Sequence, residues 1–228
     1  MNQILDSNIK DINKKNSNFN NKKEKKNNFF KIQFLFSSFI AIICLVFYLY
    51  FYSSSNKEEI LSKKIVDNFN ISRLYSNTNQ LSTGIQVVEL PNTYEIDKNK
   101  FTVIGLIEIP SISITYPIIS EMKDEFLKIA PCRFYGPLPN QVGNMCIAGH
   151  NYENYKFFSR IRELQNGNSI FIYDEFGNKL EYLVYKKYET TDDDLNPVNQ
   201  DTNNLREITL VTCNNVTGNR IIIKAKEK

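Results

Sequence analysis

The segment ITLVTCNNVTGNRIII, residues 208–223, contains two apolar runs that are joined by a polar turn. The first run ends at Cys213, and the second begins directly after Arg220. Side chains alternate between the two faces of a strand, so Ile208 and Leu210 share one face and Cys213 lies on the other. The same alternation separates Arg220 from the first aliphatic residue of the second run. The pattern therefore predicts that the thiol and the guanidinium face outward, away from an aliphatic core.

The remaining sequence supplies a single histidine, His150, within CIAGHNYE at residues 146–153. A free cysteine is more often a small buried apolar residue than a nucleophile, and a lone histidine is more often structural. Together, however, an outward thiol, one imidazole and a nearby guanidinium are the groups that thiol acyl transfer needs. We therefore predict Cys213, His150 and Arg220 as catalytic residues. The pattern marks no carboxylate as a partner of His150.

Short strands separated by turns make up the C-terminal part of the chain. The predicted strands span 101–109, 112–119, 144–150, 169–174, 180–188, 207–213 and 220–225. The residues EFGN at 175–178 predict a hairpin, and short helices are expected near 122–130 and 157–164. This order predicts a mainly β fold, a closed or partly closed barrel of antiparallel strands.

The N-terminal part has a different composition. Residues 29–52 contain one charge, Lys31, and are long enough to cross a bilayer as a helix. A cleaved signal peptide would have a shorter apolar core and a small-x-small cleavage site. Residues 1–28 carry seven lysines, and positive flanks stay on the cytoplasmic side. We predict a disordered cytoplasmic tail at 1–28, a transmembrane helix at 29–52 and an extracellular C-terminal part.

Residues 53–100 are predicted to form an extracellular stalk with a short helix, ahead of a catalytic domain at 101–228. The formal net charge of +3 comes largely from the tail and indicates topology rather than nucleic-acid binding. Cys44 falls in the apolar segment, which leaves three cysteines outside it. A disulfide between Cys132 and Cys146 stays open at this point.

The motif TLVTC at 209–213, with GHN upstream at 149–151 and Arg220 downstream, resembles the signature of the sortases. Sortases are membrane-anchored cysteine transpeptidases of Gram-positive bacteria. The resemblance implies an eight-stranded barrel at 101–228 that cleaves an LPxTG-like sorting signal after threonine. Cys213 would hold the thioester, and an amine on a cell-wall precursor or a pilin would resolve it.

The resemblance also implies roles for individual residues. His150 would act as acid and base, while Arg220 would stabilise the oxyanion or bind the motif. Beside this pair, Thr212 and Asn151 are expected to bind substrate. No cofactor is required; calcium is a lower-ranked option, because charged surface loops are far commoner than metal sites. Its candidate ligands are Glu121, Asp124, Glu125 and Asp192 to Asp194.

The subclass is predicted from segments that flank the motif. Residues 189–204 are too short and too rich in turn residues for the long helix that class B sortases carry there. No second hydrophobic span follows Arg220, which weakens a resemblance to class C. Class A or class D is therefore favoured.

Other functions remain open. An L,D-transpeptidase would place Ser-x-Gly-Cys around its nucleophile, and an NlpC/P60-type peptidase would place cysteine before histidine. A non-catalytic barrel that binds peptides would use Cys213 structurally. Leu90 to Thr93 spell the start of an LPxTG motif and would make an internal pseudo-substrate, although an ordinary polar linker is the favoured interpretation.

Overall fold

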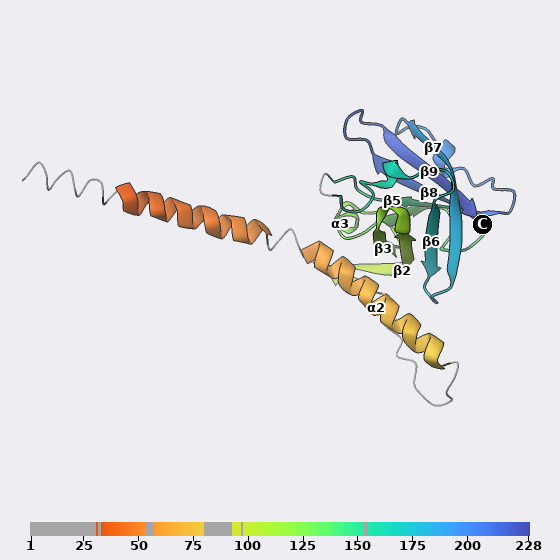
Figure 1. Cartoon of the computed structure of the whole chain (residues 1–228), viewed down its shortest axis with the longest axis horizontal. Coiled ribbons are helices and arrows are strands. Elements are labelled where there is room, and N and C mark those ends of the chain that lie inside the picture. The colour runs from red at the N-terminus through yellow and green to blue at the C-terminus, as the bar shows by residue number, and fades with distance from the viewer. Residues whose placement is uncertain (1–30, 32, 53–56, 80–92, 97, 153–154) are drawn as a thin grey trace, which may run out of the picture. The chain divides into compact units, whose positions relative to one another are not determined.

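The computed structural model describes residues 31, 33–52, 57–79, 93–96, 98–152 and 155–228. The chain divides into two compact units, Met1–Asn56 and Lys57–Lys228 (Figure 1). The predicted cytoplasmic tail at 1–28 lies outside the described residues.

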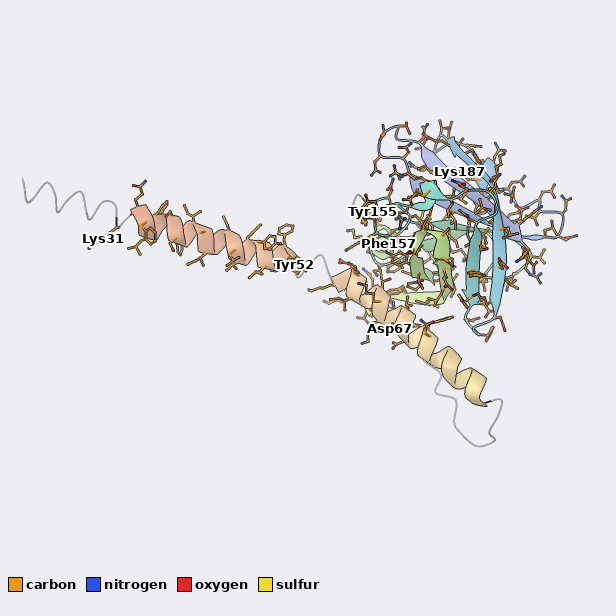
Figure 2. The ribbon with its side chains drawn as sticks, in the orientation of Figure 1. Lys31, Tyr52, Asp67, Tyr155, Phe157 and Lys187 are labelled. Carbon is orange, nitrogen blue, oxygen red and sulfur yellow. The ribbon has the colours of Figure 1, made fainter. Side chains whose placement is uncertain are left out.

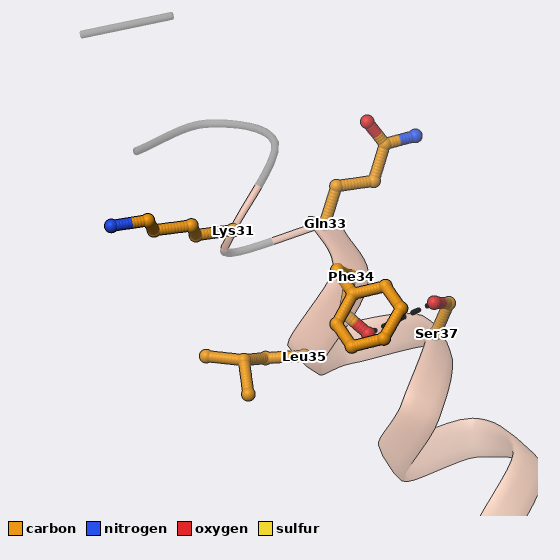
Figure 3. A pocket seen from close by; sticks show the side chains of 5 residues that line it. All are labelled: Lys31, Gln33, Phe34, Leu35 and Ser37. Carbon is orange, nitrogen blue, oxygen red and sulfur yellow. Dashed lines mark hydrogen bonds between the residues drawn. The ribbon is translucent and has the colours of Figure 1, made fainter. Parts of the chain in front are cut away.

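The first unit contains one apolar helix, residues 33–52. Its large side chains are exposed along the whole length, as Phe36 and Leu45 illustrate at 67% and 57%. Figure 3 shows its first turns, where the Ser37 hydroxyl donates a hydrogen bond of 2.9 Å to the Phe34 carbonyl. The side chains of this helix project into the surroundings (Figure 2), and its most apolar 18 residues have a mean hydropathy of 2.4. In the described part of the chain, this is the helix that is long and apolar enough to cross a membrane. Such a helix is consistent with a membrane anchor or a signal sequence.

The second unit is built around a closed barrel (Figure 1). Among the described residues its strands are β1 (Thr93–Ile96), β2 (Asn99–Ile109), β3 (Ile114–Ile119), β4 (Cys132–Tyr135), β5 (Gly143–Ala148), β6 (Ser169–Asp174), β7 (Lys179–Thr190), β8 (Arg206–Cys213) and β9 (Arg220–Glu227). Strands β2 to β9 follow the order β2-β3-β4-β5-β8-β9-β7-β6, and β6 pairs with β2 to close the barrel. The predicted eight-stranded barrel is confirmed, and β1 is an additional strand on β2.

The barrel is mixed, whereas the sequence predicted antiparallel strands. The pairs β3–β4 and β5–β8 are parallel, and the other neighbours are antiparallel. Parallel neighbours need a long connection. The β6–β7 hairpin and the segment after it provide that connection, because they carry the chain away from β5 before β8 returns beside it. Alternation within one strand does not reveal this pairing.

The main core fills the barrel with the aliphatic rows that the sequence predicted. Ile208 and Leu210 of β8 meet Ile221 and Ile223 of β9 in this core. The predicted helices are shorter in the structure: α3 spans Asp124–Leu127, and the second is the 3-10 turn η2, Ile161–Glu163. Two further 3-10 turns are η1 (Pro110–Ile112) and η3 (Asn196–Val198).

Helix α2, Lys57–Asn79, packs on the barrel and extends the compact unit N-terminal to Phe101. Ile65 is fully buried in a second apolar cluster with Phe101 and Phe126, whose rings lie 5.3 Å apart. The sequence predicted a stalk with a short helix in this region. Its apolar residues are few and interspersed with charge, so the sequence alone does not show that one face of α2 packs on the barrel.

Strand β1 begins at the last residue of the LPxTG-like match. Leu90 to Asn92 lie outside the described residues, whereas Thr93 starts β1 and pairs with Thr102. The four cysteines are free thiols, so Cys132 and Cys146 form no disulfide. Cys132 pairs across the sheet with Ala148, and Cys146 pairs with Tyr135.

Candidate active site

The turn between β8 and β9 brings the predicted nucleophile and arginine together. Cys213 and Arg220 are direct partners in the antiparallel register, so both side chains leave the same face of the sheet. They border a groove of about 640 Å³, which His150 also lines. The structure therefore places all three predicted catalytic residues at one groove, and the thiol is exposed there.

Because β5 and β8 pair in parallel, His150 lies at the same edge of the barrel as the Cys213 thiol. Ala148 pairs with Val211, and the Gly149 amide donates to the Val211 carbonyl at 3.1 Å. Both strands run in the same direction, so they end at the same edge of the barrel. His150 and Cys213 each lie two residues beyond a member of that pair, which explains how residues 63 positions apart meet.

Side-chain hydrogen bonds cross-link the two strand ends around these residues. The Thr212 hydroxyl donates to the Gly149 carbonyl at 2.7 Å, and the Asn151 amide donates to the Cys213 carbonyl at 2.7 Å. Asn215 adds a bond of 3.0 Å to the Asn151 carbonyl. Thr212 and Asn151, predicted as substrate-binding residues, are buried, and these polar groups hold the histidine and cysteine segments together.

Close packing beneath His150 requires a glycine before it. A β-carbon at Gly149 would lie 2.7 Å from the Phe158 ring, far inside normal contact distance. The Phe158 amide in turn donates to the His150 carbonyl at 3.0 Å. The glycine of the GHN motif therefore lets Phe158 pack against the end of β5.

Burial controls the protonation of His150. Removal of the imidazole from water lowers the pKa of His150 below its usual range. Asp124, at the start of α3 and also on the groove, partly opposes this shift, while Lys128 reinforces it. The Tyr152 ring lies 4.9 Å from the imidazole. A neutral imidazole at neutral pH can accept the thiol proton and later release it to a leaving amine.

Arg220 is held by two contacts at the edge of the groove. One guanidinium nitrogen donates to the Gly218 carbonyl at 3.1 Å, and another lies 3.9 Å from the Asp192 carboxylate. The Arg220 side chain is one-third exposed, so its guanidinium group remains accessible to a peptide carbonyl or a developing oxyanion.

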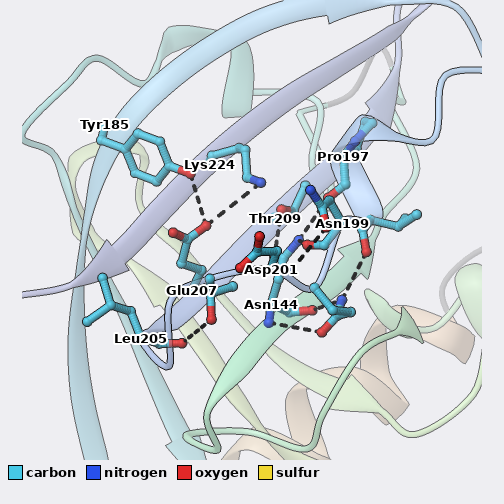
Figure 4. A network of polar contacts seen from close by, with 12 residues as sticks. Asn144, Tyr185, Pro197, Asn199, Asp201, Leu205, Glu207, Thr209 and Lys224 are labelled. Atoms are coloured by element: carbon cyan, nitrogen blue, oxygen red, sulfur yellow. Dashed lines mark hydrogen bonds and ion pairs between the residues drawn. The ribbon is translucent and has the colours of Figure 1, made fainter.

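A buried polar network fixes the groove wall that the segment between β7 and β8 forms (Figure 4). Asn144 donates to the carbonyls of Pro197 and Asn199 at 2.9 and 3.0 Å, and Gln200 donates back to the Asn144 carbonyl at 2.9 Å. The Thr209 hydroxyl donates to the Asn144 side-chain oxygen at 2.8 Å. This network was not predicted from the sequence. The sequence feature that could have indicated it is Asn144, a polar residue in an otherwise apolar strand, because a buried asparagine needs hydrogen-bond partners.

The other two cysteines of the barrel are poor nucleophiles. Burial raises the pKa of Cys132 and of Cys146 to about 12 in both cases. Both side chains have no exposed surface, whereas Cys213 is exposed. Among the barrel cysteines, the geometry favours Cys213 alone as the attacking thiol.

Several of the carboxylates predicted as calcium ligands have other partners. Asp194 accepts hydrogen bonds from Thr190 and Asn196, and Glu121 pairs with Lys123. Asp192 faces Arg220 instead. Within the described residues no group of three or more metal-binding side chains comes together.

Comparisons with known proteins agree on one family. The model described as "Sortase domain" matches residues 107–228. Sortase A of Bacillus anthracis is 35% identical over 142 residues, which cover 60% of this chain and 65% of that protein, just under two thirds of its length.

Solved structures match the fold. The sortase D5 transpeptidase of Clostridium perfringens is 26% identical with a TM-score of 0.55, covering 75% of this chain and 98% of that one. Sortase A of Corynebacterium diphtheriae, 22% identical with a TM-score of 0.52, covers 76% of this chain and 88% of its own. Sortase C structures of C. perfringens also match, so the solved relatives include classes A, C and D.

Proposed function

Because the chain belongs to the sortase family of cysteine transpeptidases, we propose that it cleaves an LPxTG-like sorting signal after threonine and transfers the surface protein to an amine. The observation that carries this proposal is the shared groove, where an exposed Cys213 faces Arg220 across the sheet and His150 ends the neighbouring parallel strand. A binding protein with a structural cysteine would have no need of an exposed thiol at this position.

The first half of the reaction forms a thioester. His150 takes the proton of the Cys213 thiol, and the thiolate attacks the carbonyl carbon of the threonine. The electron pair of the carbonyl moves to its oxygen, which the Arg220 guanidinium stabilises. As the tetrahedral intermediate collapses, His150 protonates the departing glycine nitrogen, the peptide bond breaks and the acyl group stays on sulfur.

The second half returns the enzyme to its starting state. The acceptor amine attacks the thioester while His150 removes its extra proton. A new amide bond forms as the Cys213 thiolate leaves, and the thiolate takes that proton from His150. The acceptor is an amine on a cell-wall precursor or a pilin. The imidazole thus alternates as base and acid, which fits a pKa that burial moves below its usual range rather than above it.

The groove has apolar walls that suit the leucine and proline of such a signal. Met122 and Leu127 line it, together with Leu195 and Val198 of the β7–β8 segment. Leu195 is 76% exposed, and a bound apolar side chain would cover it. These apolar side chains support a signal with apolar residues over a polar one.

The apolar helix supports a location at the cell membrane. Its exposed side chains match a single membrane-spanning segment. With the lysine-rich residues 1–28 on the cytoplasmic side, the barrel lies outside the cell, where the surface proteins and the wall amines are found.

The deciding experiment is mass spectrometry of the chain mixed with a fluorogenic LPETG peptide and triglycine. We expect cleavage after threonine, a transfer product that carries the triglycine, and a trapped thioester whose mass maps to Cys213. Cys213→Ala must abolish all three. Stable peptide binding without cleavage would support a non-catalytic barrel, and cleavage of wall tetrapeptides instead would support an L,D-transpeptidase.

A further inference from the structure

Helix α2 contacts the segment that follows His150. The Glu59 carboxylate lies 2.5 Å from the Lys156 ammonium and also pairs, at 2.8 Å, with Lys63 one turn along the helix. Hydrogen bonds from both lysines lower the pKa of Glu59. The Glu59 and Lys156 side chains are about one-third and one-quarter exposed. The first turn of α2 is therefore joined to Lys156, next to Phe157, by a close, partly shielded ion pair.

Lys156 is the neighbour of a residue that packs toward the imidazole. The Phe157 amide donates to the Tyr116 hydroxyl at 3.1 Å, and the two rings lie 5.2 Å apart. Phe157 also contacts Tyr152 at 5.6 Å, and Tyr152 contacts His150 at 4.9 Å. A continuous row of aromatic rings thus runs from β3 to the imidazole, and Lys156 adjoins it.

The other end of this connection is fixed to the barrel. Ile65 of α2 is fully buried in the cluster that contains Phe101 and Phe126, and α2 lies against β3, the strand that carries Tyr116. Helix α2 cannot move without exposing this apolar surface. Glu59 therefore projects from a rigid element, as a support for another residue must.

We propose that Glu59 is a positioning residue for the reaction: by holding Lys156, α2 keeps the packed rings of Phe157 and Tyr152 in place, and with them the imidazole of His150 beside Cys213. The role rests on the proposed function, because it assumes that His150 transfers protons during peptide cleavage. It makes the helix that follows the apolar segment a part of the active site, although it does not line the groove.

The test measures peptide cleavage by the full-length chain in detergent micelles. A partly exposed ion pair changes an equilibrium about two- to five-fold, so Glu59→Gln and Lys156→Gln should each lower kcat about three-fold and leave KM unchanged. Charge reversal by Glu59→Lys should cost more, about ten-fold, because like charges then meet. Adding Lys156→Glu to that variant should return kcat to within about two-fold of the wild type.

Lys63→Gln is the matched control, because it removes the pair within the helix and keeps the pair with Lys156. It should retain wild-type kcat. An equal loss in Lys63→Gln and Glu59→Gln, or no recovery in the double exchange, would overturn the proposal by reducing Glu59 to a helix-stabilising residue.

Hydrogen exchange supplies a readout that needs no substrate. Amides in residues 150–158 should exchange about three-fold faster in Glu59→Gln than in the wild type or in Lys63→Gln. Unchanged exchange would overturn the proposal even if kcat fell. If the wild-type chain cleaves no LPxTG-like peptide, the proposed function fails, and the exchange result still decides whether α2 orders this segment.

Discussion

Burial and the charge of Asp124 act on the pKa of His150 in opposite directions, and their balance sets the pH range in which the imidazole is neutral. Burial lowers its pKa, and Asp124 partly restores it. A base with a lowered pKa stays unprotonated to lower pH, so the acidic limb of kcat/KM should lie below the usual histidine pKa of about 6.5. The sequence could not rank these two effects, because both depend on which side chains line the groove.

Asp124→Asn should move that acidic limb to lower pH. The carboxylate favours the protonated imidazole, so its removal lowers the pKa of His150 further and leaves the neutral base present in more acidic solution. The measurement is the pH dependence of kcat/KM for an LPxTG-like peptide. Glu125→Gln, an exposed neighbour on the same short helix, should leave the profile unchanged. A limb that stays in place in Asp124→Asn would show that the imidazole does not sense this carboxylate.

Cys213 should be the only barrel thiol that iodoacetamide labels at pH 7.5. The thiolate is the reactive form, and burial raises the pKa of Cys132 and Cys146 to about 12, which leaves only a trace of thiolate on either. Peptide mapping of the fragment from Lys57 to Lys228 should show one modified cysteine, and full labelling should appear only in urea. Rapid labelling of Cys132 or Cys146 in the folded protein would contradict the burial of these two side chains.

The ends of strands β5 and β8 lie side by side and together position His150 and Cys213. Strand alternation predicted the outward thiol and guanidinium, and Cys213 and Arg220 do face each other across β8 and β9. Alternation says nothing about which strands are neighbours, so the parallel β5–β8 pair that delivers His150 could not be predicted. The same limit explains why the hydrogen bond from the Asn151 side chain to the Cys213 carbonyl could not be predicted.

Asn151→Ala should lower kcat with little change in KM. Its amide donates one hydrogen bond that joins the histidine and cysteine segments, and such a bond contributes about 1 kcal/mol, which corresponds to a five-fold loss when it holds reacting groups in register. Steady-state kinetics with an LPxTG-like peptide measure both constants. Asn168→Ala provides a control, because that side chain caps an exposed turn at Gln165. A selective rise in KM would instead return Asn151 to a substrate-binding role.

For the molecule as a whole, the barrel strands and their inward faces follow from patterns that are local in sequence, while the parallel pairings and the extent of the compact unit do not. The predicted strands and the apolar rows of β8 and β9 are present in the structure. Strand β4 was missed because its four residues, CRFY, are too few to show alternation. The sequence predicted a stalk here because Ile65, a fully buried residue of α2, packs in a cluster whose other buried members, such as Phe101 and Phe126, are distant in sequence.

A fragment that begins at Phe101 should therefore be less stable than one that begins at Lys57. The shorter fragment lacks α2 and β1, which exposes the face of the cluster that Ile65 covers and removes the Tyr94 ring stacked 5.9 Å from Phe101. Burial of one large aliphatic side chain contributes about 1.5–3 kcal/mol, so the free energy of unfolding should fall by at least about 2 kcal/mol. Urea denaturation followed by circular dichroism measures this difference.

In the longer fragment, Ile65→Ala should reproduce much of the loss of stability. Ile60→Ala, at a position 63% exposed, should leave the midpoint of urea denaturation nearly unchanged. Equal midpoints for the two fragments would mean that α2 rests on the barrel without stabilising it.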